Sequence, residues 1–358
     1  MNKKNMPINK GNYCSFETQE REKLFEKYKA EGWERQYKQY RKNWRRFPKK
    51  EIVSDYPLLV DLELSSICNL NCPMCYTITD EFKKRVKATL MDYNLFTKIV
   101  DELSGNVPAI RLSLRGEPTL HPRFIECIKY AKNRGIREIS FLTNGSRLDS
   151  ESFVKIMDAG ATWITISIDG LADKYEAIRK PLIFEETLQK IKSIKKIKEK
   201  KNSLKPVIKI QSLWPAIRNN PSMFYKTFVP FVDLIAFNPL IDYLQKDEDI
   251  VFIESFSCPQ LYQRLVVGAD GQVMMCSNDE ESSHVIGDAN RETIYEIWHG
   301  KNLNKVRKLH QVKNGFKQIS ACKRCYLPRE TEITEIAEVD GRKFGILNYV
   351  NRAQRIGE

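Results

Sequence analysis

The sequence lacks any long hydrophobic run. No apolar stretch approaches the roughly 18 residues that a membrane-spanning helix needs. The first ten residues, MNKKNMPINK, contain no apolar segment of the kind that secretory signals carry. Internal repeats and low-complexity linkers are absent as well. We therefore expect a globular chain of 358 residues that works in the cytoplasm, without a membrane as a partner.

Histidine is scarce, whereas cysteine is not. The four histidines have no ligand-like spacing and receive no role: they are His121, His284, His299 and His310. Seven of the nine cysteines fall into two groups with metal-ligand spacing, and cytoplasmic cysteines bind metals more readily than they form disulfides. Cys14 stands alone, and Cys127 lies on the apolar stripe of a predicted helix, where we expect a core residue.

The net charge of +13 is concentrated at the N-terminus. Residues 1–50 contain ten Lys and five Arg against six Glu, so 15 − 6 gives +9. One helix is predicted over residues 17–46, with a boundary at Pro48 and an aromatic stripe formed by Phe25, Tyr28, Trp33, Tyr37, Tyr40, Trp44 and Phe47. Basic residues between aromatics can bind RNA by stacking. Since no recognised nucleic-acid module is present, we favour packing of the stripe against the main body, and nucleic acid is not an expected partner.

From residue 57 onward, short β-branched runs alternate with amphipathic segments of about a dozen residues, the pattern of βα units around a parallel sheet. The predicted strands are Leu58–Leu64, Ala109–Leu114, Glu138–Thr143, Trp163–Ile168, Val207–Gln211 and Leu234–Phe237. Predicted helices lie near residues 91–104, 122–134, 149–159, 184–201 and 221–228. Six such units are too few for an eight-fold barrel, so we expect an α/β fold with an open, partial (β/α)6 barrel.

The first cysteine group is Cys68, Cys72 and Cys75, which follows the first predicted strand. Three thiolates within eight residues can bind one soft metal centre and leave a fourth position open. A closed structural zinc site wants four ligands, whereas iron–sulfur clusters are held by cysteines at such short spacings. A zinc knuckle with a distant fourth ligand is the alternative at this point.

Polar motifs follow the other predicted strands at their carboxyl ends, where active sites of parallel βα folds lie. They are Arg115–Gly116–Glu117–Pro118, Thr143–Asn144–Gly145, Ser167–Ile168–Asp169–Gly170 and Gln211. Turns use the same residue types, but turn chemistry alone does not explain why each motif falls at one end of the sheet.

The cysteine spacing, with Tyr76 after the last cysteine, and the motif after the second strand resemble the radical S-adenosylmethionine (radical SAM) superfamily over residues 57–240. The resemblance implies that Cys68, Cys72 and Cys75 bind a [4Fe–4S] cluster whose open iron chelates SAM. It also implies a SAM pocket, with the Tyr76 backbone meeting the adenine, Gly116, Glu117 and Pro118 meeting the methionine amino group, and Asn144, Ser167, Asp169, Arg179 and Gln211 completing the pocket. Arg115, where many relatives have Gly, is expected to meet an anionic substrate or to form a surface ion pair.

The second cysteine group is Cys258, Cys276, Cys322 and Cys325, and four thiolates fit a closed site for zinc or an iron–sulfur cluster. A hairpin is predicted between the first two, around Asp270–Gly271. The spacing C-x12-G-x4-C followed by C-x2-C, with the segment Ile294–Gly300 between the pairs, resembles the shortened SPASM domain called twitch, which implies one auxiliary [4Fe–4S] cluster. The expected parts are a basic helical extension (1–56), the partial barrel (57–240) and a small α+β auxiliary-cluster domain (241–358), beginning with a strand-like segment at 241–257.

The combined resemblance implies a radical SAM oxidoreductase, similar to aminocyclitol dehydrogenases, that acts on a small sugar or cyclitol derivative. Flavodoxin or ferredoxin is the expected electron donor. Asp242, Asp247, Asp249 and Glu254 are the candidates for a general base. Two alternatives are epimerisation in place of oxidation and modification of a peptide or protein; a third is an RNA-directed enzyme that uses the basic N-terminus.

Overall fold

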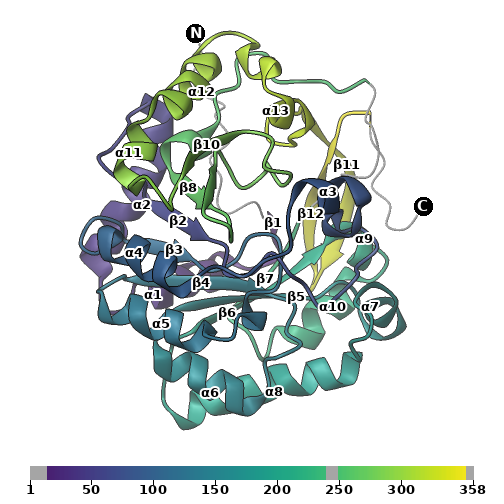
Figure 1. The fold of residues 1–358 in the computed structure, drawn as a ribbon. Helices are drawn as coiled ribbons and strands as arrows, with labels where there is room; N and C mark the ends of the chain where they lie inside the picture. The colour runs from purple at the N-terminus through teal and green to yellow at the C-terminus, as the bar shows by residue number, and fades with distance from the viewer. Residues whose placement is uncertain (1–13, 239–248, 352–358) are drawn as a thin grey trace.

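The computed structural model describes residues 14–238 and 249–351 (Figure 1). One ten-stranded sheet, in the order β1-β7-β6-β5-β4-β3-β2-β8-β9-β10, forms the framework, and a separate hairpin pairs β11 with β12. The strands are β1 (Cys14–Ser15), β2 (Leu59–Leu62), β3 (Ala109–Arg111), β4 (Glu138–Thr143), β5 (Trp163–Ser167), β6 (Val207–Leu213), β7 (Leu234–Asn238), β8 (Arg264–Val267), β9 (Gln272–Met274), β10 (Val285–Asp288), β11 (Thr331–Val339) and β12 (Arg342–Tyr349).

Helices cover the outer face of the parallel strands, and further helices lie in the N- and C-terminal parts of the chain (Figure 1). They are α1 (Gln19–Ala30), α2 (Glu34–Lys50), α3 (Asp80–Arg85), α4 (Tyr93–Leu103), α5 (Phe124–Asn133), α6 (Ser150–Ala159), α7 (Ala172–Ile178), α8 (Phe184–Lys200), α9 (Trp214–Ile217), α10 (Pro221–Phe228), α11 (Ile294–His299), α12 (Lys301–Gln311) and α13 (Ser320–Arg324). Short 3-10 turns are η2 (Tyr76–Ile78), η3 (Pro118–Leu120), η4 (Pro259–Tyr262) and η5 (Gly315–Gln318).

Strands β2 to β7 pair in parallel and in sequence order, which confirms the partial (β/α)6 arrangement. Each strand is almost wholly buried, as β-branched strands of a parallel sheet are when both faces are covered. Helices α4 and α6 begin where the Asp92 and Asp149 side chains accept hydrogen bonds from the backbone of the first turn. The predicted strands and helices of this region are therefore confirmed, with ends that differ by a few residues.

The N-terminal extension packs against the barrel, as predicted, but it consists of two helices. The helix is interrupted at Gly32, whose φ of +77° is readily adopted only by glycine. The predicted helix boundary at Pro48 is wrong, because Pro48 lies inside α2. Buried aromatics of both helices, including Trp33 and Trp44, pack on Leu59, Ala109 and other residues at the amino-terminal ends of the strands. Five rings of the predicted stripe are therefore buried, whereas Tyr28 and Phe47 are partly exposed.

Strands β8 to β10 of the C-terminal region continue the barrel sheet, whereas β11 and β12 form the separate hairpin. Strand β8 pairs in parallel with β2, from Leu59 opposite Arg264 to Leu62 opposite Val267, and β9 and β10 follow as antiparallel strands. The predicted hairpin around Asp270–Gly271 is confirmed, and the segment that resembles the twitch domain between the cysteine pairs contains α11, which begins with a capping box at Thr293. Within 249–257, however, the structure has only an isolated bridge, from Phe252 to Arg329, so the predicted strand is wrong there.

The C-terminal hairpin returns to the other edge of the barrel. Glu335 of β11 accepts hydrogen bonds from Trp214 and Arg218, at 3.3 and 2.9 Å, and Phe344 packs on Phe16 next to β1, with ring centroids 5.4 Å apart. Among the described residues, no helix is long and apolar enough to cross a membrane.

Candidate functional site

The first cysteine group lies on the loop that follows β2. Cys68 is exposed, Cys72 is buried and Cys75 is half-buried. Burial raises the pKa of the Cys68 thiol and raises that of Cys72 to about 11, and the sulfurs of the group lie near enough to one another to add to both shifts. Three neighbouring thiols therefore stand at the carboxyl end of the sheet, where a cationic centre would favour their thiolate forms.

Gly116 and Glu117 attach the next strand end to this loop. A Cβ on Gly116 would lie 2.5 Å from the carbonyl oxygens of Ser65 and Ile67, so only glycine permits this approach. The Glu117 backbone N–H donates to Ile67 O at 2.8 Å. The turn after β3 is thus held against the residue that precedes Cys68.

The Glu117 carboxylate has an internal role that the sequence did not indicate. It accepts hydrogen bonds from Thr119 Oγ1 (2.6 Å), Thr143 Oγ1 (2.7 Å) and the Asn144 backbone N–H (2.7 Å). Burial raises its pKa, while these donors oppose the shift. The side chain therefore joins the ends of β3 and β4, and Pro118 begins the 3-10 turn beside it.

Asn144 connects the end of β4 to the cysteine loop. Its side-chain amide donates to Asn69 Oδ1 at 2.9 Å and approaches Cys68 Sγ at 3.9 Å. Tyr76, directly after Cys75, is half-buried, and its ring meets that of Phe82 edge-on at 5.4 Å. The predicted pocket residues at the first three strand ends thus surround the three cysteines.

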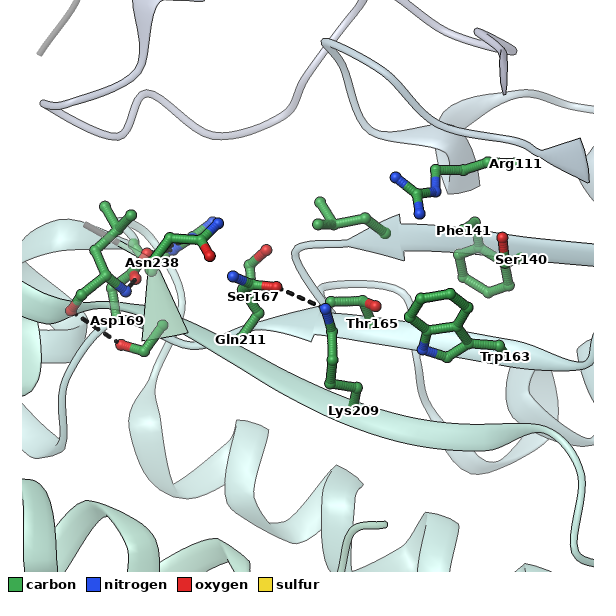
Figure 2. A pocket seen from close by; sticks show the side chains of 14 residues that line it. Arg111, Ser140, Phe141, Trp163, Thr165, Ser167, Asp169, Lys209, Gln211 and Asn238 are labelled. Carbon is green, nitrogen blue, oxygen red and sulfur yellow. Dashed lines mark hydrogen bonds and ion pairs between the residues drawn. The ribbon is translucent and has the colours of Figure 1, made fainter. Parts of the chain in front are cut away.

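A cavity of about 310 Å³ lies inside the barrel below this loop (Figure 2). It is lined by Arg111, Ser140, Phe141, Leu142, Trp163, Thr165, Ser167, Asp169, Arg179, Lys209, Gln211, Ser212, Leu213 and Asn238. Four of the predicted pocket residues belong to this lining: Ser167, Asp169, Arg179 and Gln211. A volume of this size fits a small ligand.

Asp169 and Arg179 lie at the upper end of the cavity, next to the cysteine loop. Arg179 Nε donates to Asp169 Oδ2 at 2.8 Å, and Asp169 Oδ1 accepts from the Leu213 backbone N–H at 2.9 Å. The Arg179 guanidinium is close enough to Cys72 to oppose the increase in the pKa of that thiol. Arg179 is thus a lining residue of the cavity whose charge reaches the cysteine loop.

Arg115 has a different role from either of those expected. Its guanidinium and backbone N–H bond the buried carboxylate of Glu63, with Arg115 Nε to Glu63 Oε1 at 2.7 Å. It also donates to Glu280 O (3.1 Å) and Ser282 Oγ (2.9 Å) of the loop after β9. Arg115 therefore holds the C-terminal region on the barrel and forms no surface ion pair.

The second cysteine group is gathered as the spacing predicted. Cys258, Cys276, Cys322 and Cys325 line one small, mostly apolar cavity in the C-terminal region. Burial raises the pKa of all four thiols, to about 12 for Cys258 and about 11 for Cys325. Four thiolates in such surroundings would repel one another without a cation, and thiolates are the donors of a soft metal centre, although no three ligand side chains of the described residues stand in metal-binding positions.

His310 belongs to this second site, although its sequence position gave no sign of it. Its Nδ1 accepts from the Cys258 backbone N–H at 3.3 Å, and its Nε2 lies 3.5 Å from Cys322 Sγ. Burial lowers its pKa to about 4. The Asn278 side-chain amide donates to Cys325 Sγ at 3.2 Å. His310 comes from α12, and only the fold brings it beside α13.

The two candidate general bases within the described residues, Asp249 and Glu254, do not line the cavity. Glu254 is exposed and pairs with Lys313 at 2.7 Å, and Asp249 lies on the surface with a φ of +61°. Asp242 and Asp247 lie outside the described residues. Cys127, by contrast, is a fully buried core residue, as predicted.

Two family models match the chain, one over each cysteine group. Residues 62–205 match the family model of the radical SAM superfamily, and residues 258–326 match the model of an iron–sulfur cluster-binding domain named SPASM. The chain therefore contains a radical SAM domain followed by a SPASM-type domain. Its cofactors are SAM, the [4Fe–4S] cluster of the radical SAM domain and an auxiliary iron–sulfur cluster.

The individual relatives match this chain at low sequence identity. The chain is 32% identical to the tungsten-containing aldehyde ferredoxin oxidoreductase cofactor-modifying protein of Pyrococcus furiosus, over 42% of each chain. It spans less than half the length of the curated relatives it matches. SuiB of Streptococcus suis bound to S-adenosylmethionine shares the fold, with a TM-score of 0.55, 12% identity and coverage of 81% of this chain and 78% of SuiB. BtrN in complex with AdoMet and 2-DOIA has a TM-score of 0.50 and 15% identity, over 77% of this chain and 94% of BtrN.

Proposed function

We propose that this chain is a radical SAM oxidoreductase that removes a hydrogen atom from a small polar molecule bound in the barrel cavity. The observation that carries the proposal is the position of the cavity, whose lining residues Ser167 and Gln211 stand at the carboxyl ends of β5 and β6, the end of the sheet at which the cysteine loop follows β2. Its volume of about 310 Å³ suits a small molecule better than a peptide.

In this proposal the first group of cysteines, Cys68, Cys72 and Cys75, holds the SAM-binding cluster. When bound, the cluster supplies the electron that converts SAM to methionine and a hydrogen-abstracting radical, while the auxiliary cluster provides a site for a second electron. The turn at Gly116, the Asn144 amide and the Tyr76 backbone orient SAM above the cavity. Glu117 positions this site indirectly, because its carboxylate joins the ends of β3 and β4.

The remaining residues of the cavity orient the substrate and limit the access of water. Ser167 and Gln211 lie opposite each other on β5 and β6 at the upper level, nearest the cysteine loop. The reaction is dehydrogenation of a sugar or cyclitol alcohol to a ketone. Flavodoxin or ferredoxin supplies the first electron, and the four cysteines Cys258, Cys276, Cys322 and Cys325 hold the cluster that accepts the second.

Anaerobically purified protein tests this proposal. We expect about eight iron and eight sulfide per chain, the content of two [4Fe–4S] clusters, and formation of 5′-deoxyadenosine from SAM after reduction with dithionite. Substrate candidates are then compared by the product formed: a ketone supports dehydrogenation, whereas an epimerised alcohol contradicts it. About four iron with one zinc would contradict the role of the second site in electron transfer.

A further inference from the structure

Arg111 and Lys209 carry positive charge into the middle of the barrel. Arg111 ends β3, Lys209 lies in the centre of β6, and both side chains point into the cavity (Figure 2). Burial lowers the pKa of Lys209, and the nearby charge of Arg111 lowers it further. Two cations in one buried space are unfavourable unless an anion accompanies them.

The Arg111 guanidinium has room for a ligand. It donates no hydrogen bond to any described residue, and 28% of its side chain is accessible, on the side that faces the cavity. Arg111 forms an ion pair with the buried Asp61 carboxylate, but its Nε lies 3.9 Å from Asp61 Oδ1, beyond hydrogen-bond range, and Arg264 Nε bonds the other oxygen at 2.7 Å. A planar guanidinium with unused donors is suited to a carboxylate or phosphate.

The other polar groups of the cavity include donors and acceptors, among them Asn238 Oδ1, which has no donor among the described residues. Lys209 Nζ donates to Gln211 Oε1 at 2.6 Å, which leaves Gln211 Nε2 without an acceptor among the described residues. Asp169 supplies the one carboxylate among the described lining residues, and it is paired with Arg179. The lining is thus rich in cations and N–H donors and poor in free carboxylates.

The position of Arg111 fixes where an anion would lie. Through the sheet pairing, Arg111 stands level with Ser140 and Trp163, whereas Ser167 and Gln211 stand four residues further along β5 and β6, nearest the cysteine loop. From the floor of the barrel, Lys29 places its ammonium 4.0 Å from the centre of the Trp163 ring, and it pairs with Glu138 at 3.4 Å. An anionic group at Arg111 would therefore place the rest of a small molecule between the floor and the cysteine loop.

We propose that the substrate carries a carboxylate or phosphate and that Arg111 binds this group at the base of the cavity. That the bound anion is a substrate rests on the proposed function. The anion site itself does not depend on radical chemistry. An amine-bearing molecule such as an aminocyclitol would meet like charge at this position.

The test measures binding of inorganic phosphate and of acetate by calorimetry, with SAM at saturation so that the sites for its own carboxylate are filled. Anaerobic protein with both clusters is used at constant ionic strength, and acetamide serves as the neutral probe. We expect the wild type to bind at least one of the two anions and not acetamide, and Arg111→Gln to weaken that binding about ten- to hundredfold. Arg111→Lys, which keeps the charge but not the fork, should lie between them.

Arg123→Gln is the matched control, because Arg123 is an exposed arginine on the ring of Tyr93, and it should bind the anion as the wild type does. Preference for phosphate or for acetate distinguishes the two kinds of substrate, and either result supports the site. Equal binding by wild type and Arg111→Gln would overturn the inference, and so would binding to the wild type that disappears when SAM is added. Formation of 5′-deoxyadenosine without substrate separates the two proposals, because its absence in the wild type contradicts the radical function while leaving the anion result intact.

Discussion

The two cysteine groups differ in number, burial and surroundings. The first has three members on a loop, with Cys68 exposed and Cys75 half-buried, and it adjoins a polar cavity. The second has four members, of which Cys258, Cys276 and Cys322 are buried, and aromatic residues such as Phe256 line its small cavity. A three-thiol site at an open edge leaves space for a small molecule, whereas a four-thiol site in an apolar shell leaves space for the metal centre alone.

This contrast is tested most strongly by removing one cysteine of the open group. Cys72→Ala should abolish 5′-deoxyadenosine formation and lower the iron content by about four per chain, because only one cluster loses a ligand. Iron analysis and chromatography of the SAM products measure both effects. Cys127→Ala is the control: this thiol is buried in α5, away from both groups, and its replacement should leave iron unchanged. Retention of 5′-deoxyadenosine formation in Cys72→Ala would refute the role of the open group.

Removal of a cysteine from the closed group should have a narrower effect. Cys276→Ala should also lower iron by about four per chain, but cleavage of SAM without substrate should continue, since the cysteine loop after β2 is intact. Complete oxidation of substrate should be lost. If Cys276→Ala stops SAM cleavage while keeping its fold by circular dichroism, the two groups do not act separately.

The smallest predicted effect concerns the ion pair that joins the two regions. Arg115→Met leaves the buried Glu63 carboxylate without its partner and should lower the free energy of unfolding by about 3–5 kcal/mol, measured by urea denaturation. The double variant Glu63→Leu with Arg115→Met should recover much of this loss, because no unpaired charge remains. Arg134→Gln, which removes an exposed pair with Asp101, should cost less than about 1 kcal/mol. Similar losses in the buried and exposed variants would contradict the joining role.

The sequence predicted features that depend on local pattern. The β-branched runs gave β2 to β7, and the spacing of the cysteines identified both groups, because these signals lie within a few residues of one another. The strand alternation also carries a signal for the cavity: Arg111 and Lys209 are charged residues inside the largely apolar strand sequences AIRL and VIKIQ, at positions that face the barrel interior.

Features that depend on long-range packing could not be predicted in the same way. His310 approaches Cys322 through the packing of α12 beside η5 and α13, and no spacing rule connects the two residues. The roles of Arg115 and Glu117 also depend on partners that only the folded chain supplies, Glu63 and the threonines 119 and 143. Glycine at position 32 is a local signal for the end of a helix, but the strong aromatic periodicity on both sides of it favours one continuous helix.

The pairing of β8 with β2 has a consequence for how this chain is made. Leu59 cannot find its neighbour Arg264 until some two hundred further residues have left the ribosome, so the edge of β2 stays uncovered during most of synthesis. An uncovered edge strand is a template for pairing with other chains. A fragment that stops after β7 would keep that edge permanently, and its tendency to aggregate would come from the missing strand and not from a missing cluster.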